Sequence, residues 1–158
     1  MERDGDGWLD CTCGSRHWGR WGAAGLLLVD PAEPASVLLQ LRAEWSHNGG
    51  TWGVPGGARD SHETPVEAAL REAAEELGVD PTVVTVFGDH AEDHGNWRYD
   101  TILATADRLN LTMEHNRETS DAAWIAFDDV TAQPLHPAFA GAWPKLRHAI
   151  EQHLHHTS

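Results

Sequence analysis

The sequence is poor in basic residues. Only 11 lysines and arginines stand against 25 aspartates and glutamates, which gives a formal net charge of −14. Such a chain repels the phosphate backbone of DNA or RNA unless a compact basic patch offsets the charge, and the sequence contains no such patch. It also repels free nucleotides, so an anionic substrate would need a divalent cation. We therefore exclude nucleic-acid polymers as partners and predict that any reaction at phosphate depends strictly on metal.

Long apolar runs are absent as well. No run approaches the roughly 20 residues that span a bilayer, and the acidic N-terminus, MERDGDGWLD, is unlike a signal peptide. A chain of 158 residues with 41% apolar content can bury one hydrophobic core. We therefore predict a single cytoplasmic domain over residues 1–158, with no membrane contact and with residues 1–17 as a flexible extension. The sequence does not decide between a monomer and a homodimer.

Cysteine is scarce, because Cys11 and Cys13 are the only two. With His17 they could supply part of a zinc site, since thiolates and imidazole are the preferred ligands of zinc. A fourth ligand is not evident from the sequence, and the spacing lacks the usual two to four residues between cysteines. A disulfide between residues this close in the chain would be strained. Both a zinc site and two unlinked thiols stay open, and the spacing favours unlinked thiols.

The apolar segments indicate a mixed α and β fold. Strand-like segments, short and rich in apolar or β-branched residues, occur at residues 23–29, 36–41, 82–87, 98–104 and 122–127. Residues 30–35 contain two prolines and predict a turn, which makes the first two segments adjacent central strands. A final helix from about Pro144 to His153, with Pro144 in its first turn, is expected to cover the sheet.

Tryptophan and histidine are abundant, with 8 and 11 residues. Core packing is the simplest role for most of the indoles. Trp45 and Trp97 are the best candidates for stacking on a base, because polar and glycine-rich neighbours place them in loops. Residues 90–94 carry two histidines and are expected to form a solvated loop between strands.

Residues 64–78 have the features of a capped helix. Thr64 is a good N-cap residue and Pro65 suits the first helical position. Glu67 follows Thr64 by three residues, so the two can form a capping box. Gly78 offers a left-handed stop. An apolar stripe on this helix would pack against a sheet.

Three glutamates share another face of this helix. At about 100° per residue, Glu72, Glu75 and Glu76 point into one region, although like charges four residues apart destabilise a helix. A solvated acidic face is the simplest interpretation of such a cluster on an arbitrary helix. The preceding segment, residues 52–57, changes this balance, because Gly56 and Gly57 permit positive φ angles and a close approach of the backbone to an ion. Carboxylates and a carbonyl oxygen suit Mg²⁺ or Mn²⁺.

The segment GARDSHETPVEAALREAAEELGV, residues 57–79, resembles the box that defines the Nudix hydrolases, GX5EX7REUXEEXGU with U a bulky aliphatic residue. All charged positions and both glycines match, and only Ala73 departs, at the first U position. The resemblance implies an α/β/α sandwich around a mixed sheet. It also implies Mg²⁺-dependent hydrolysis of a nucleoside diphosphate linked to another group.

The resemblance assigns roles to individual residues. It implies that Glu72 and Glu76 are metal ligands, that Glu75 is a third ligand or the general base, and that Arg71 orients the glutamates through salt bridges. Glu72, Glu75 and Arg71 are thus the expected catalytic residues, whereas Glu63 is expected to be structural. The Gly56 carbonyl resembles a further metal-binding position. Nudix enzymes often add a glutamate from a later loop, and Glu118 is our choice for that role.

The substrate stays open at this level. Oxidised nucleoside triphosphates, ADP-ribose, dinucleoside polyphosphates and nicotinamide dinucleotides all fit the resemblance, and the small size of the chain mildly favours a hydrolase that removes damaged nucleoside triphosphates. The alternative from another class is a Nudix-fold module that binds or senses a nucleotide without cleaving it, because a fold does not fix a function. The complete set of glutamates favours the enzyme.

Overall fold

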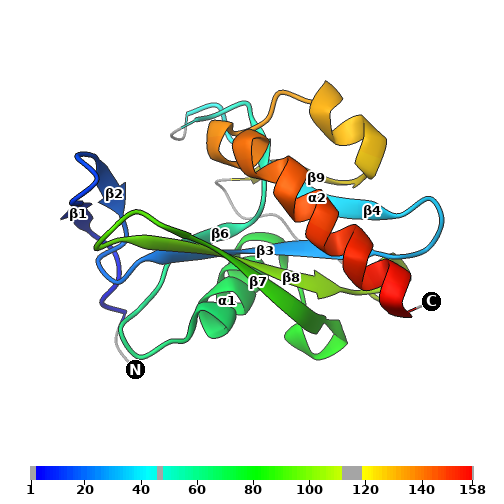
Figure 1. Cartoon of the computed structure of the whole chain (residues 1–158), viewed down its shortest axis with the longest axis horizontal. Coiled ribbons are helices and arrows are strands. Elements are labelled where there is room, and N and C mark those ends of the chain that lie inside the picture. Colours follow the sequence, from blue (N-terminus) through cyan, green and yellow to red (C-terminus); the bar gives the residue numbers. More distant parts are fainter. Residues whose placement is uncertain (1–2, 46–47, 112–118, 158) are drawn as a thin grey trace.

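The structure, a computed structural model, describes residues 3–45, 48–111 and 119–157 (Figure 1). A mixed sheet of seven strands lies between two helices. Its strand order is β5-β4-β3-β8-β7, with β6 paired to β3 and β9 paired to β4. The bounds are β3 Ala23–Asp30, β4 Ser36–Arg42, β5 Trp52–Gly53, β6 Gly56–Ala58, β7 Thr85–Asp93, β8 Arg98–Thr105 and β9 Thr119–Ala126.

The central strand β3 pairs parallel with β8 and antiparallel with β4 and β6. All eight residues of β3 are buried, as expected for a strand covered on both faces. Alternate side chains enter two separate cores. Leu27 and Val29 pack towards helix α2, Pro137–Thr157, and Leu26 and Leu28 pack towards helix α1, Pro65–Leu77. The predicted α/β/α sandwich is therefore confirmed, with one helix on each face of the sheet (Figure 1).

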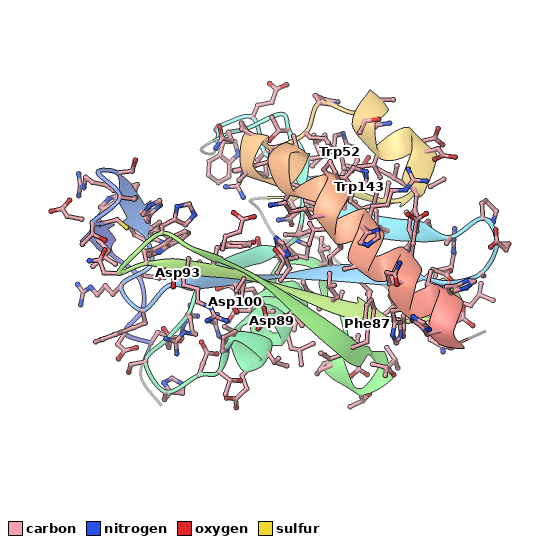
Figure 2. All side chains as sticks on the ribbon, viewed as in Figure 1. Trp52, Phe87, Asp89, Asp93, Asp100 and Trp143 are labelled. Carbon is pink, nitrogen blue, oxygen red and sulfur yellow. The ribbon has the colours of Figure 1, made fainter. Side chains whose placement is uncertain are left out.

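The α2 side holds the larger aromatic residues. Trp143 is buried on α2, with Phe127 and Phe139 beside it, and Trp52 packs against the same cluster (Figure 2). Phe87 of β7 stacks on His153 of α2 at a centroid distance of 3.9 Å. The expectation that most tryptophans pack in the core is wrong, because Trp8, Trp18, Trp21 and Trp45 are exposed and only Trp143 of the eight is buried.

The final helix differs from its prediction. It begins at Pro137, seven residues before Pro144, which lies inside the helix. Pro137 takes the first-turn position that suits proline, and the His136 carbonyl accepts the first helical bond, from Ala140 N at 2.8 Å. Of the helices in the described part of the chain, none is long and apolar enough to cross a membrane.

The segment after α1 was also predicted with wrong bounds. Residues Pro81–Val83 form a 3-10 turn, capped by the Asp80 side chain, and β7 begins only at Thr85. The strand then continues through His90 to Asp93, where a loop was predicted. Among the described strands, β7 lies at the edge of the sheet and pairs with β8 alone, so its polar side chains can alternate with partly buried ones.

Two short strands precede the sheet. β1, Trp8–Asp10, and β2, Arg16–Trp18, pair antiparallel as a hairpin that stands beside the turn between β7 and β8 (Figure 1). Two further 3-10 turns, Arg108–Asn110 and Phe127–Ala132, follow β8 and β9.

Candidate functional site

The site begins where β6 meets β3. Gly56 pairs with Gly25 and Gly57 with Ala24 in an antiparallel register. Neither Gly56 nor Gly57 has a positive φ, so that part of the predicted reason for these glycines is wrong, whereas the close approach of the backbone to an ion stays a prediction. Close packing is the reason instead. A Cβ atom at position 57 would lie 2.7 Å from the carboxyl carbon of Glu72, and one at position 56 would lie 2.6 Å from the Ala24 carbonyl oxygen.

Helix α1 carries the acidic residues and is fixed at both ends. The Thr64 hydroxyl accepts from Glu67 N at 3.1 Å, and the Glu67 carboxylate accepts from Thr64 N at 2.9 Å, which is the predicted capping box. Gly78 ends the helix in the left-handed conformation, with φ 71° and ψ 21°. The buried side chains Ala69, Ala73 and Leu77 then hold the helix against the sheet, and the carboxylate of Glu72 lies against Gly57 of β6.

Arg71 connects several groups of the site through hydrogen bonds. Its Nε and one terminal nitrogen bind both oxygens of Glu63, at 2.6 and 2.9 Å. The other terminal nitrogen reaches Glu72 at 2.8 Å and Glu75 at 3.4 Å, and a further bond goes to the Ala58 carbonyl at 3.0 Å. The guanidinium therefore ties the segment before α1 to the glutamates. Its hydrogen bonds lower the pKa of Glu63, and Glu63 in turn raises the pKa of Arg71.

The three glutamates of the cluster differ in exposure. The side chain of Glu75 is 47% exposed, whereas that of Glu72 is 12% exposed. Burial raises the pKa of Glu72, against the opposing effect of Arg71. Burial, and then the charge of Glu72, raise the pKa of Glu76 to about 8. In the absence of a cation, two of the three carboxylates are thus held in an environment that disfavours their charge.

Polar residues that sequence reasoning missed surround Glu76. Gln40 of β4 donates to Glu76 Oε1 at 3.2 Å, and the Thr119 hydroxyl donates to Gln40 Oε1 at 2.9 Å. Tyr99 of β8 is half-buried, and a Cβ atom at position 25 would lie 2.3 Å from its hydroxyl. Burial, followed by the negative charge of Glu76, raises the pKa of Tyr99. The strand pairing places these residues together, and the sequence alone carried no signal for them.

Asp60 is a further residue that the sequence did not single out. Its side chain is buried and accepts from Gly5 N at 2.8 Å, and its other oxygen pairs with Arg3 Nε at 2.5 Å. Arg3 also reaches Glu75, at 3.3 Å. The segment before β1 therefore folds back onto α1 and supplies positive charge to the acidic cluster.

The donors present fit a hard divalent cation. Glu76 Oε2 is buried and has no hydrogen-bond partner within the described ranges, and Glu72 fills the space that the missing Cβ of Gly57 leaves. An unpartnered buried carboxylate oxygen is costly unless something positive binds it. Carboxylate oxygens are the ligands that Mg²⁺ and Mn²⁺ prefer. Glu72, Glu75 and Glu76, with the backbone of Gly56, are the residues that would hold the ion.

The predicted residues Gly56, Arg71, Glu72, Glu75 and Glu76 thus lie together, between β6 and α1. Glu63 binds Arg71 through both carboxylate oxygens, and its structural role stays a prediction. Glu118 lies outside the described residues.

Comparisons with known proteins agree with this architecture. A family model described as NUDIX domain matches residues 19–146. A Mycobacterium tuberculosis protein named "Putative 8-oxo-dGTP diphosphatase 3" is 50% identical over 155 residues, which are 92% of this chain and 70% of that protein. A nucleoside triphosphate pyrophosphatase/Nudix hydrolase fusion protein of Bifidobacterium longum is 40% identical over 159 residues, 96% of this chain and 33% of that protein.

The crystal structure of a Nudix hydrolase from M. smegmatis, RenU, superposes with a TM-score of 0.86 at 45% sequence identity, covering 94% of this chain and 96% of that chain. The family match extends over most of the chain, and it contains the strands and helix that build the acidic cluster. The chain belongs to the Nudix family of hydrolases.

Proposed function

We propose that the protein is a cation-dependent pyrophosphohydrolase that cleaves a diphosphate bond in a nucleoside triphosphate, with an oxidised purine nucleoside triphosphate as the favoured substrate. One observation carries the proposal: Glu76 is buried beside Glu72 with an oxygen that has no partner among the described residues. Such an arrangement costs stability and is explained by binding a cation. The name of the M. tuberculosis relative supports the choice of substrate.

Each residue of the acidic cluster has its own role in the proposed reaction. Glu72 and Glu76 would hold the ion, Mg²⁺ or Mn²⁺, which would neutralise phosphate charge and lower the pKa of the attacking water. Arg71 keeps Glu72 and Glu75 in place through its bonds to both carboxylates. Glu75 is the most exposed of the three, so we assign to it the role of general base, which accepts the proton of the attacking water.

The experiment is a hydrolysis assay with purified protein and a panel of nucleotides: 8-oxo-dGTP, dGTP, ADP-ribose, a dinucleoside polyphosphate and NADH. We expect turnover with Mg²⁺, none in EDTA, and the highest kcat/KM for 8-oxo-dGTP. Glu76→Gln is expected to lose about 10²–10⁴-fold in kcat, the range for a missing acid–base or charge-stabilising group. Glu67→Gln is the matched control, because it changes a glutamate of the same helix and a glutamine at this position preserves the capping box.

Two results would contradict the proposal. Full activity of Glu76→Gln would show that the reaction does not require the buried carboxylate. Tight binding of a nucleotide in Mg²⁺ without any turnover across the panel would favour a nucleotide-binding or sensor module instead.

A further inference from the structure

The β1–β2 hairpin contacts the turn between β7 and β8 through a small polar interface. Thr12 N donates to Asn96 Oδ1 at 2.8 Å, and Asn96 donates back to the Asp10 carbonyl at 3.2 Å. The His17 ring stacks on Trp97 at 4.1 Å, nearly parallel at 9°. Each strand of the hairpin has three residues, too few to build a core of its own. What holds this hairpin in place must therefore come from its neighbours.

Both thiols of the chain and two of its histidines, His17 and His94, meet at this interface. The ligating atoms of Cys11, Cys13 and His17 all lie within 4.8 Å of one another. Cys13 Sγ is 3.2 Å from His17 Nε2, and the Cys11 thiol donates to the His94 carbonyl oxygen at 3.0 Å. The donor atoms of a tetrahedral zinc site lie about 3.3–3.8 Å apart, given Zn–S and Zn–N bonds of about 2.3 and 2.0 Å. The three side chains are thus already close to a ligating arrangement.

A candidate for the fourth ligand comes from the other side of the interface. The ring of His94, in the turn after β7, lies 5.0 Å from the ring of His17. These two histidines are 77 positions apart in the sequence, so only the packing of the hairpin against the sheet brings them together.

We propose that Cys11, Cys13 and His17 bind a zinc ion, that His94 supplies the fourth ligand, and that the ion fastens the β1–β2 hairpin to the β7–β8 turn. This site is separate from the acidic cluster on α1 and differs from it in chemistry. Thiolates and imidazole select zinc, whereas carboxylate oxygens select magnesium or manganese. The two sites can therefore hold different ions in the same molecule.

Another group of potential ligands, Asp60, His62 and Glu63, does not carry the same argument. Arg3 pairs with Asp60, and Arg71 binds both oxygens of Glu63. Their negative charge is already balanced by protein groups. Among the described residues, the thiols of Cys11 and Cys13 contact backbone groups and His17, and neither thiol pairs with an arginine or a lysine.

The test measures the metal content of tag-free protein that is kept reduced. Thiol titration before loading confirms that both thiols are free. Zinc is added with excess Mg²⁺ to occupy the acidic cluster, and unbound metal is removed by gel filtration. We expect one zinc per chain in the wild type and in Glu76→Gln, which alters the acidic cluster alone. Cys13→Ser is expected to lose the zinc, and because Cys13 is exposed the variant should fold, as circular dichroism will show.

Cobalt provides an independent readout of the ligands. Wild-type protein loaded with Co²⁺ should show thiolate-to-cobalt charge-transfer absorption and the intense visible bands of a tetrahedral site. Cys13→Ser should lose the charge-transfer absorption, and His94→Asn should retain it with altered visible bands. Equal zinc content in the wild type and Cys13→Ser, or no thiolate band in the wild type, would overturn the site. Unchanged visible bands in His94→Asn would overturn the assignment of the fourth ligand.

Discussion

Glu76 shows how a single residue can be unfavourable for folding and useful for a function. Its carboxylate is buried, lies near Glu72, and accepts a hydrogen bond from Gln40. Burial raises its pKa from an ordinary value of 4.5 to about 8. The charged form that binds a cation is therefore the form that the fold disfavours, and the cation itself must supply the missing stabilisation.

The first prediction concerns the free energy of unfolding in EDTA. Because the pKa of Glu76 is higher in the folded state, its contribution to stability is complete below about pH 4.5 and is lost as the pH rises through 8. Between pH 5 and pH 8 we expect the free energy of unfolding of the wild type to fall by on the order of 2–4 kcal/mol relative to that of Glu76→Gln, because one pKa unit corresponds to about 1.4 kcal/mol. Urea unfolding of both proteins at each pH measures this difference.

Mg²⁺ is the control for this prediction. The ion binds the wild type, so its addition at pH 8 should reduce or reverse the stability advantage of Glu76→Gln over the wild type. A difference between the two proteins that stays constant from pH 5 to pH 8 would show that the pKa of Glu76 is not raised by folding.

A second prediction at this scale concerns two glycines with different surroundings. At position 57 a Cβ atom would lie 2.7 Å from the Glu72 carboxylate, so Gly57→Ala should displace Glu72 and reduce kcat at least about tenfold through misplaced catalytic groups. At position 141 the added Cβ would meet nothing within 4 Å. Gly141→Ala, in helix α2, is therefore the matched control and should gain about 0.4–1 kcal/mol with unchanged kcat. Equal kcat in the two variants would contradict the role of close packing.

At the scale of elements, the two helices follow different rules. Helix α1 is specified locally, because Thr64, Glu67 and Gly78 fix both of its ends. Helix α2 contains Pro144 in its interior, against local preference, and is held by the burial of Trp143, Leu146 and Ile150 against the sheet. Tertiary burial outweighs the helix-breaking residue in α2.

Pro144 gives a prediction for α2. The proline has no N–H to donate to the Ala140 carbonyl, and its side chain is exposed. Pro144→Ala should therefore raise the free energy of unfolding by about 1–2 kcal/mol, since the helical penalty of about 3 kcal/mol exceeds the gain that proline brings by restricting the unfolded chain. Urea unfolding measures the change. Pro137→Ala, at the exposed first turn, is the control and should show no gain; a loss of stability in Pro144→Ala would mean that the ring is needed for packing.

At the scale of the whole molecule, the net charge of −14 opposes compaction. Local ion pairs work in the other direction, such as those of Arg71 with Glu63 and of Arg108 with Asp30. These pairs involve a partly covered arginine and a buried carboxylate, so salt screens them less than it screens the repulsion between exposed charges.

Salt should therefore stabilise the protein in EDTA. Raising NaCl from about 10 to 100 mM shortens the Debye length from about 30 to 10 Å. We expect the thermal midpoint to rise by about 2–4 °C, which corresponds to roughly 1 kcal/mol for a chain of this size. Differential scanning calorimetry measures the midpoint, and sucrose at equal osmolality controls for solvent exclusion. A falling midpoint would mean that the ion pairs outweigh the repulsion.

The sequence by itself determined the features that depend on near neighbours in the chain. The capping box of Thr64 and Glu67, the stop at Gly78 and the common face of Glu72, Glu75 and Glu76 follow from spacing on one helix, and strands β3, β4 and β8 follow from short apolar runs. The same local information misplaced the start of α2, because a proline fits a first turn equally well at positions 137 and 144. It also missed β7 beyond Phe87, because polar residues on an edge strand resemble a loop.

Only the tertiary structure decided which distant residues complete each site. The pairing of strands brings Gln40 into contact with Glu76 and Tyr99 into the range of its charge, and the packing of two hairpins brings His94 to His17. It also changed the reason for Gly57, from backbone freedom to the space that Glu72 occupies. Burial and long-range contact set the pKa of Glu76 and the partners of the thiols, and neither quantity is contained in residue spacing.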